Sequence, residues 1–293
     1  MFRPGFIEAR DLNEAYFQLI SLCWENGVRY EITEGSNKGG YRLELPVAAG
    51  IIHFPHTRPL APVMPPGVPA TTTDEKIQDY FTEYLMNPTL EPNEEYRYAT
   101  WINGPLFNPY IRLTQEPRAG GKFFGFGCEN PHTSQLDWCI RHFKDKGLGN
   151  NHCFITVGDP KVNFNYDSPY RNETERKTSP CLRGLDIKVK DNQVLLGIIY
   201  RSWDLFAGFP ENMGGFTLLN EYIANELGVE PGPLTFFSQG LHCYDYQIGT
   251  VMAYLRKDDD VVNFFDDRCG CKTDCIGEIQ PNVCTPNCPD FEE

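Results

Sequence analysis

The sequence lacks a long apolar run, and no stretch approaches the ~18 consecutive apolar residues that a membrane-spanning helix requires. Its N-terminal segment carries Glu8, Asp11 and Glu14 where a secretory signal peptide would need an apolar core. Basic residues are also scarce: 26 Lys and Arg stand against 40 Asp and Glu, a formal net charge of −14. That charge argues against non-specific binding to nucleic acid or to an anionic membrane. We therefore expect a cytoplasmic protein that binds neither.

Apolar residues recur with helical spacing in four segments. The predicted helices cover residues 8–26, 74–86, 134–147 and 214–227. Asp74 and Ser134 are placed to cap the second and third helices at their N-termini. Gly147 and Gly228 are placed to end the last two.

Extended patterns lie between these helices. They predict strands within residues 30–47, 152–160, 184–190, 194–202 and 233–249. Asp191-Asn192 predicts a hairpin turn between two of them, and residues 55–73, with six prolines, predict an irregular loop. No internal repeat is present. The pattern is that of a mixed α/β (α+β) protein with one domain over residues 1–267 and a separate tail over 268–293.

The tail is distinguished by its cysteines. The chain has an odd total of 11, of which five crowd the last 25 residues, namely Cys269, Cys271, Cys275, Cys284 and Cys288. Without a secretion signal, such a cluster favours thiolate ligands over a disulfide framework. We expect a structural zinc or iron–sulfur site, although the spacing is not a standard zinc pattern. The alternative is a disordered or disulfide-bridged tail.

Residues 179–246 place one cysteine ahead of a series of polar residues. These are Cys181, Arg201-Ser202-x-Asp204, Asn212 and His242-x-Tyr244. Each has a structural interpretation: a lone cysteine is usually a small buried apolar residue, and Asn212 is well placed as an N-cap. As functional groups, Arg201 would lower the pKa of a nearby Cys181 thiol, and the Asn212 carboxamide would recognise an imide or amide edge. His242 and Tyr244 alternate on a strand and therefore share a face suited to hydroxyl contacts.

The joint order of these residues resembles the thymidylate synthase family. Its motifs appear as Pro180-Cys181, Arg201-Ser202-Trp203-Asp204, Gly208-Phe209-Pro210-Glu211-Asn212 and His242-Cys243-Tyr244. The stretches GNNHCFI, SPCLRG and RSWDL are most similar to the archaeal type. The resemblance implies a large twisted mixed sheet flanked by helices, and a homodimer.

The resemblance also implies a reaction. Cys181 would add to carbon 6 of dUMP, and carbon 5 would then take a one-carbon unit from methylene-tetrahydrofolate or a methanopterin analogue, giving dTMP. Arg201 and Ser202 would bind the phosphate, and Arg201 would also keep Cys181 ionised. Asn212 would recognise the base as uracil. His242 and Tyr244 would bind the ribose hydroxyl. Asp204 would hold the pterin ring of the carrier.

Several family features are changed. Leu182 replaces the histidine that commonly follows the cysteine, and Asn150-Asn151-His152 replaces the arginine pair that a partner subunit supplies to the phosphate. Phosphate binding therefore needs other arginines, with Arg29, Arg42 and Arg183 as candidates. Glu83 best matches the acid that manages proton transfers, although a solvated acid is an equal alternative.

The tryptophan that shields the family's intermediate from water has no clear counterpart. This change makes a pyrimidine nucleotide 5-hydroxymethylase, acting on dUMP or on dCMP or CMP, the nearest alternative function. Two further alternatives come from other classes: a non-catalytic nucleotide-binding protein, and a redox or metal-sensing protein in which the tail dominates.

Overall fold

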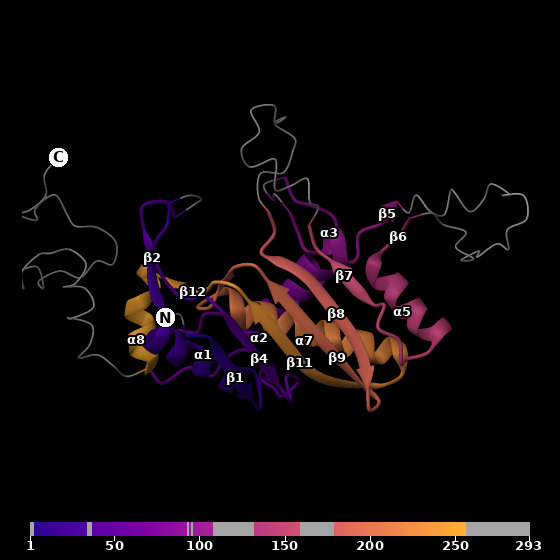
Figure 1. The fold of residues 1–293 in the computed structure, drawn as a ribbon, viewed down its shortest axis with the longest axis horizontal. Helices are drawn as coiled ribbons and strands as arrows, with labels where there is room; N and C mark the ends of the chain where they lie inside the picture. Colours follow the sequence, from indigo (N-terminus) through magenta and orange to yellow (C-terminus); the bar gives the residue numbers. More distant parts are fainter. Residues whose placement is uncertain are drawn as a thin grey trace, which may run out of the picture.

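The computed structural model describes residues 3–33, 37–92, 94, 96–107, 132–158 and 179–255 (Figure 1). The predicted boundary at residue 267 and the five cysteines of the tail lie outside these residues. Within them, a mixed six-stranded sheet forms the centre of the molecule. Its strands, in spatial order, are β1 (Gly5–Ala9), β4 (Ala48–Ile52), β11 (Glu230–Ser238), β9 (Gln193–Tyr200), β8 (Leu182–Lys190) and β7 (Phe154–Thr156).

A second sheet of four strands carries part of the polar series. Its order is β10 (Trp203–Asp204), β12 (Leu241–Tyr244), β3 (Tyr41–Leu45) and β2 (Val28–Glu31). A short pair, β5 (Leu106–Phe107) and β6 (His132–Thr133), lies apart from both sheets. The predicted mixed α/β class is confirmed, with a large mixed sheet, a second smaller mixed sheet and flanking helices. Gly240, with φ of 85°, breaks the single strand predicted over residues 233–249 into β11 and β12.

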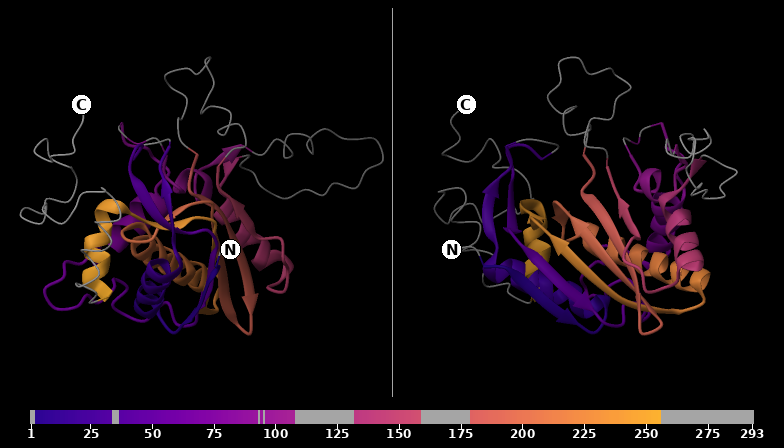
Figure 2. Two further views of the ribbon diagram at one scale, coloured as in Figure 1. Left: turned by 60° about the vertical axis from the view of Figure 1, so that its left-hand side comes forward. Right: turned by 45° about the vertical axis from the view of Figure 1, so that its right-hand side comes forward.

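Helices cover one face of the six-stranded sheet, where α7 (Gly208–Leu227) runs behind β9 and β11 (Figures 1 and 2). Phe216 and Leu219 of α7 are fully buried in the same core as Leu196 and Leu234 of the strands. The other helices are α1 (Leu12–Asn26), α2 (Asp74–Asp79), α3 (Ala99–Ile102), α5 (Gln135–Lys146) and α8 (Ile248–Leu255), with a π-helix over Tyr80–Met86 and a 3₁₀ turn over Asp245–Gln247. Among the described residues, no helix covers the opposite face of the sheet, and large apolar side chains such as Phe6 and Phe237 are exposed there.

Local sequence signals placed several elements correctly. The Ser134 side chain accepts a hydrogen bond from the backbone of Asp137 and caps α5, and Gly147 ends that helix at φ of 90°. Asp191 and Asn192 both have positive φ, as a two-residue hairpin turn between right-twisted strands requires.

Three helix predictions need correction. Residues 5–9 form β1, because their alternating burial suits a strand, and Asp11 then caps α1 at Leu12. Thr73, not Asp74, caps α2, and the second half of that segment is the π-helix. The α7 helix begins six residues earlier than predicted, at Gly208, so Asn212 lies inside it and is not an N-cap.

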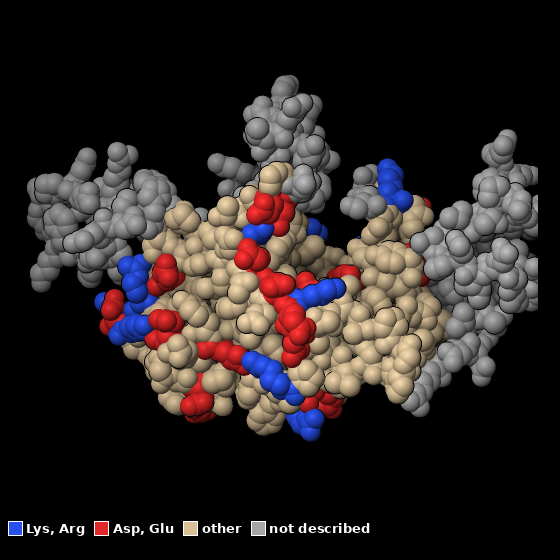
Figure 3. Space-filling model, turned by 180° about the vertical axis from the view of Figure 1, so that it is seen from behind, with Lys and Arg blue, Asp and Glu red and all other residues tan. Residues whose placement is uncertain are grey.

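Charged side chains of both signs lie on the face opposite the view of Figure 1, with Asp and Glu forming an interrupted line across it (Figure 3). Among the described residues, none of the helices combines the length and apolar character needed to cross a membrane.

Candidate active site

Cys181 and Arg201 lie side by side because β8 and β9 pair in antiparallel register. Cys181 immediately precedes β8, Arg201 immediately follows β9, and Leu182 is registered with Tyr200. The Arg201 amide donates to the Cys181 carbonyl oxygen over 2.9 Å. The two residues are therefore neighbours, and the Arg201 charge acts on the Cys181 thiol.

The Arg201 guanidinium is held by the chain segment that carries the cysteine. Its Nη2 donates to the carbonyl oxygen of Ser179 at 2.6 Å, and its Nε donates to that of Pro180 at 3.2 Å. Burial raises the pKa of Cys181, whereas the positive charges of Arg201 and Arg183 lower it. Cys181 is thus a half-buried thiol whose ionisation depends on two arginines.

Several tyrosines lie around this thiol, and we call them the tyrosine wall. The sequence analysis did not predict this cluster. Tyr98 accepts a 3.4 Å hydrogen bond from the Leu182 amide, and its ring lies 5.1 Å from that of Tyr84. Burial, with the nearby Cys181 thiol, raises the pKa of Tyr96 to about 12. The four tyrosines within residues 80–98 were the available signal, but π-helical and loop spacing produce no periodic pattern.

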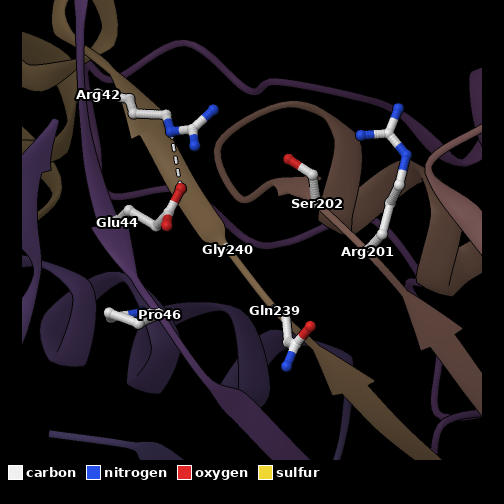
Figure 4. Close-up of a pocket in the computed structure, with 7 residues that line it drawn as sticks. All are labelled: Arg42, Glu44, Pro46, Arg201, Ser202, Gln239 and Gly240. Atoms are coloured by element: carbon white, nitrogen blue, oxygen red, sulfur yellow. Dashed lines mark ion pairs between the residues drawn. The ribbon is translucent and has the colours of Figure 1, made fainter. Parts of the chain in front are cut away.

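A polar hollow of about 270 Å³ opens beside Arg201. Its lining consists of Arg42, Glu44, Pro46, Arg201, Ser202, Gln239 and Gly240. Arg42 stands on one wall and Arg201 on the other, with the Ser202 side chain between them (Figure 4). The Nε atom of Arg42 pairs with a Glu44 oxygen at 2.7 Å, and its two terminal nitrogens have no partner among the described residues. Two guanidinium groups and a hydroxyl around one hollow suit an anionic group such as a phosphate.

The other two candidate arginines lie elsewhere. Arg29 stacks over the Tyr41 ring at 4.1 Å, and Arg183 donates to the Ser179 hydroxyl at 3.0 Å. Of the three arginines named from the sequence, Arg42 is the one that lines the hollow.

His242 lies on β12 and is 3% exposed. Its Nδ1 is 2.9 Å from the Gly240 carbonyl oxygen, which is only an acceptor, so Nδ1 carries the proton. Burial lowers the pKa of His242 to about 4, and the ring is therefore neutral at pH 7. Its Nε2 is consequently a buried acceptor, and it has no partner among the described residues. The Tyr244 ring packs edge-on against it at 4.8 Å, so the two side chains lie together as predicted.

Asn212 lies near the start of α7, and Asp204 ends β10 shortly before that helix begins. The Asn212 Oδ1 atom accepts hydrogen bonds from Trp203 Nε1 at 2.8 Å and from Tyr200 Oη at 3.1 Å. Asp204 Oδ1 accepts from the Phe206 amide at 2.9 Å, and burial raises the pKa of this carboxyl. The same oxygen also lies 3.4 Å from the Ala207 amide and 3.5 Å from Gln247 Nε2, which donate to it.

Glu83 lies on the exposed side of the π-helix. It accepts a 2.8 Å hydrogen bond from Asn87 and pairs with Arg97 at 3.4 Å, and its side chain is 61% exposed. The neighbouring Tyr84, by contrast, is half-buried, and burial raises the pKa of its hydroxyl. The proton-transfer function of Glu83 remains a prediction, and its environment is that of the solvated acid given as the alternative.

Within the part of the chain that the structure describes, no group of three or more His, Cys, Asp or Glu side chains is arranged to hold a metal ion. The predicted cluster of Cys269, Cys271, Cys275, Cys284 and Cys288 lies outside that part.

Comparisons with known proteins point to one family. The thymidylate synthase family model matches residues 164–263, which include the cysteine, arginine, asparagine and histidine described above. A protein of Methanosarcina acetivorans, provisionally named thymidylate synthase, is 38% identical over 242 residues, covering 82% of this chain and 89% of its own length. A protein of Methanosarcina mazei with the same provisional name is 22% identical over the same coverage. Over a shorter stretch, 29% of this chain and 39% of its own length, a Methanococcoides burtonii protein so named is 35% identical.

Proposed function

The chain belongs to the thymidylate synthase family, and we propose that it is a one-carbon transferase that converts dUMP to dTMP. The proposal assigns roles to Cys181, Arg201, Asn212 and His242, and the observation that supports it is the pairing of β8 with β9, which brings Cys181 beside Arg201 at the polar hollow. Each of the four residues offers the chemistry that one part of a pyrimidine nucleotide requires.

Cys181 is the proposed nucleophile. Its sulfur forms a bond to carbon 6 of the base, and the electron pair moves through carbon 5 to the carbonyl oxygen at carbon 4. Carbon 5 then bonds to the methylene group of the carrier. Loss of the proton on carbon 5 and departure of the carrier leave an exocyclic methylene. Hydride transfer from the reduced carrier and release of the sulfur complete the methyl group.

The phosphate is proposed to lie in the polar hollow. Arg201 and Ser202 contact it from one side, and Arg42 supplies from the same chain a charge that the family usually takes from a partner subunit. Glu44 holds the Arg42 side chain by its Nε and leaves the terminal nitrogens for the ligand.

The sugar is proposed to lie against β12. The unpartnered Nε2 of His242 accepts a hydrogen bond from a ribose hydroxyl, and Tyr244 lies beside it. An unpaired buried acceptor has a free-energy cost in the free protein, and a bound hydroxyl removes that cost.

The buried Asp204 carboxyl is the proposed contact for the pterin ring of the carrier. Both reduced folate and methanopterin derivatives carry such a ring, and they are the two candidate carriers. The tyrosine wall, against which Trp101 packs with its ring 5.9 Å from Tyr96, favours a methyl product. We propose that it limits the access of water to Cys181, and a hydroxymethyl group would need that water.

We also propose that the open face of the six-stranded sheet pairs with a second copy. Phe6 and Phe237 are 66% and 40% exposed, and the register of β1, β4 and β11 aligns them in one row through Ala49. An apolar row across a sheet face is typical of an interface.

The test is release of tritium from dUMP labelled at carbon 5, measured with methylene-tetrahydrofolate and with its methanopterin analogue. We expect release with one carrier, none with Cys181→Ala, and a product whose mass shows a methyl group. A hydroxymethyl mass would indicate the hydroxymethylase, and release with neither carrier would contradict both enzymes in favour of a binding protein.

A further inference from the structure

The carboxamide of Asn212 is held in one orientation by two donors. Trp203 Nε1 lies 2.8 Å and Tyr200 Oη 3.1 Å from its Oδ1 atom. An indole nitrogen carries a hydrogen and cannot accept, so the amide atom that faces Trp203 must be the oxygen. The orientation of this amide is thereby set by the chemistry of its neighbour.

Both lone pairs of the Asn212 oxygen are used by these contacts. The Nδ2 group has no hydrogen-bond partner among the described residues, and Asn212 is only partly buried. The edge that Asn212 offers to a ligand therefore consists of N–H donors. A reversed amide would place N–H groups against the Trp203 N–H, which is repulsive.

The two donors are themselves rigid. The rings of Trp203 and Tyr200 stack with centroids 3.9 Å apart and planes at 4°, and both side chains are 2% exposed. Phe209 and Phe236 pack against the indole at 4.9 Å and 6.1 Å. A side chain enclosed in this way has few alternative rotamers, so its hydrogen bond defines a fixed direction.

We propose that Trp203 and Tyr200 are positioning residues that set base specificity through Asn212. The donor edge accepts the carbonyl at carbon 4 of uracil, and it opposes the amino group that cytosine carries there. This inference rests on the proposed function, because it assumes that the base lies against Asn212. It adds that the asparagine alone does not decide the preference.

The test measures the dissociation constants of dUMP and dCMP by calorimetry for the full chain and its variants. Trp203→Phe removes the donor-only group, and Tyr200→Phe removes the second donor while keeping the ring. We expect the native protein to prefer dUMP. Trp203→Phe should reduce that preference at least about tenfold, chiefly through tighter dCMP binding, because the amide is then free to reverse. Tyr200→Phe should reduce it about threefold, since Trp203 still holds the oxygen.

Tyr222→Phe is the matched control, because Tyr222 lies on the same helix and its hydroxyl makes no hydrogen bond within the described residues. It should leave the dUMP to dCMP ratio unchanged. The inference would be overturned, with the proposed function intact, by two results together. One is equally weakened binding of dUMP and dCMP in Trp203→Phe, and the other is an unchanged ratio of their dissociation constants in Tyr200→Phe. A native protein that binds neither nucleotide would overturn both. If Trp203→Phe does not fold, as judged by circular dichroism, Tyr200→Phe alone tests the inference. An unchanged ratio of the dUMP and dCMP dissociation constants in that variant then contradicts it.

Discussion

The Arg201 amide and the Cys181 carbonyl oxygen are joined by a 2.9 Å hydrogen bond at the point where β8 begins and β9 ends. The Arg201 guanidinium returns over the same segment to the carbonyl oxygens of Ser179 and Pro180. One strand pair thus fixes the proposed nucleophile and its nearest cation together. Any shift in the register of the pair would separate them.

The ionisation of Cys181 should depend on Arg183 as well as on Arg201. Burial raises the pKa of this thiol and the two arginines oppose that rise, so removing a positive charge should raise the pKa further. We expect Arg183→Gln to slow alkylation of Cys181 by iodoacetamide about threefold near pH 8. Peptide mass spectrometry isolates this cysteine from the others.

Arg183→Lys is the control for that experiment, because it keeps the charge. It should retain most of the native alkylation rate. Equal slowing in Arg183→Lys and Arg183→Gln would indicate a structural effect and contradict the electrostatic explanation.

Arg42→Gln should weaken nucleotide binding. Loss of a charge-assisted contact to the phosphate corresponds to roughly a 10- to 100-fold higher dissociation constant for dUMP. Deoxyuridine, which has no phosphate, is the matched ligand, and its weaker binding should be unchanged. Arg29→Gln is the matched variant, because Arg29 stacks on Tyr41 outside the hollow. Similar losses for dUMP and deoxyuridine in Arg42→Gln would place the phosphate elsewhere.

His242 should make stability depend on pH. Its pKa is about 4 in the folded protein against an ordinary value of 6.5, so the unfolded chain binds more protons between these values. The contribution of His242 to the free energy of unfolding is therefore fully present above about pH 6.5, and it is lost as the pH decreases toward 4. The loss attributable to His242 is about 3 kcal/mol of unfolding free energy over that interval.

The measurement is urea unfolding at pH 7 and pH 4.5 for the native chain and for His242→Asn. The asparagine cannot titrate, so the difference between the two pH values should shrink in that variant. His53→Asn, a change at a surface histidine paired with Glu8, should keep most of the native difference. An unaltered pH dependence in His242→Asn would contradict the depressed pKa.

Phe237→Asp should disrupt the proposed dimer. Placing a carboxylate at the centre of an apolar sheet face carries a large desolvation cost, which should raise the dimer dissociation constant by about a hundredfold or more. Light scattering coupled to size exclusion measures the change. Phe54→Asp is the control, because Phe54 is also exposed but lies in a loop after β4. A native chain that is monomeric at micromolar concentration would remove this proposal.

Local chemistry explains which elements could be predicted. The turn at Asp191-Asn192, the cap at Ser134 and the glycine at position 147 each act within a few residues, so the sequence displays them directly. The start of α7 could not be read in this way. Asn212 has the chemistry of an N-cap, but burial of Phe209 and Pro210 against the core extends the helix to Gly208.

A series of motifs is a property of the sequence alone. It was therefore sufficient to indicate the family and a pyrimidine nucleotide site from the order of Cys181, Arg201, Asn212 and His242 along the chain. The tertiary structure alone decided what surrounds these groups. It placed Arg42 opposite Arg201, the tyrosines around the thiol, and Trp203 against the oxygen of Asn212. These are contacts between side chains on different elements. Their distances depend on strand register and helix packing, which no local pattern encodes.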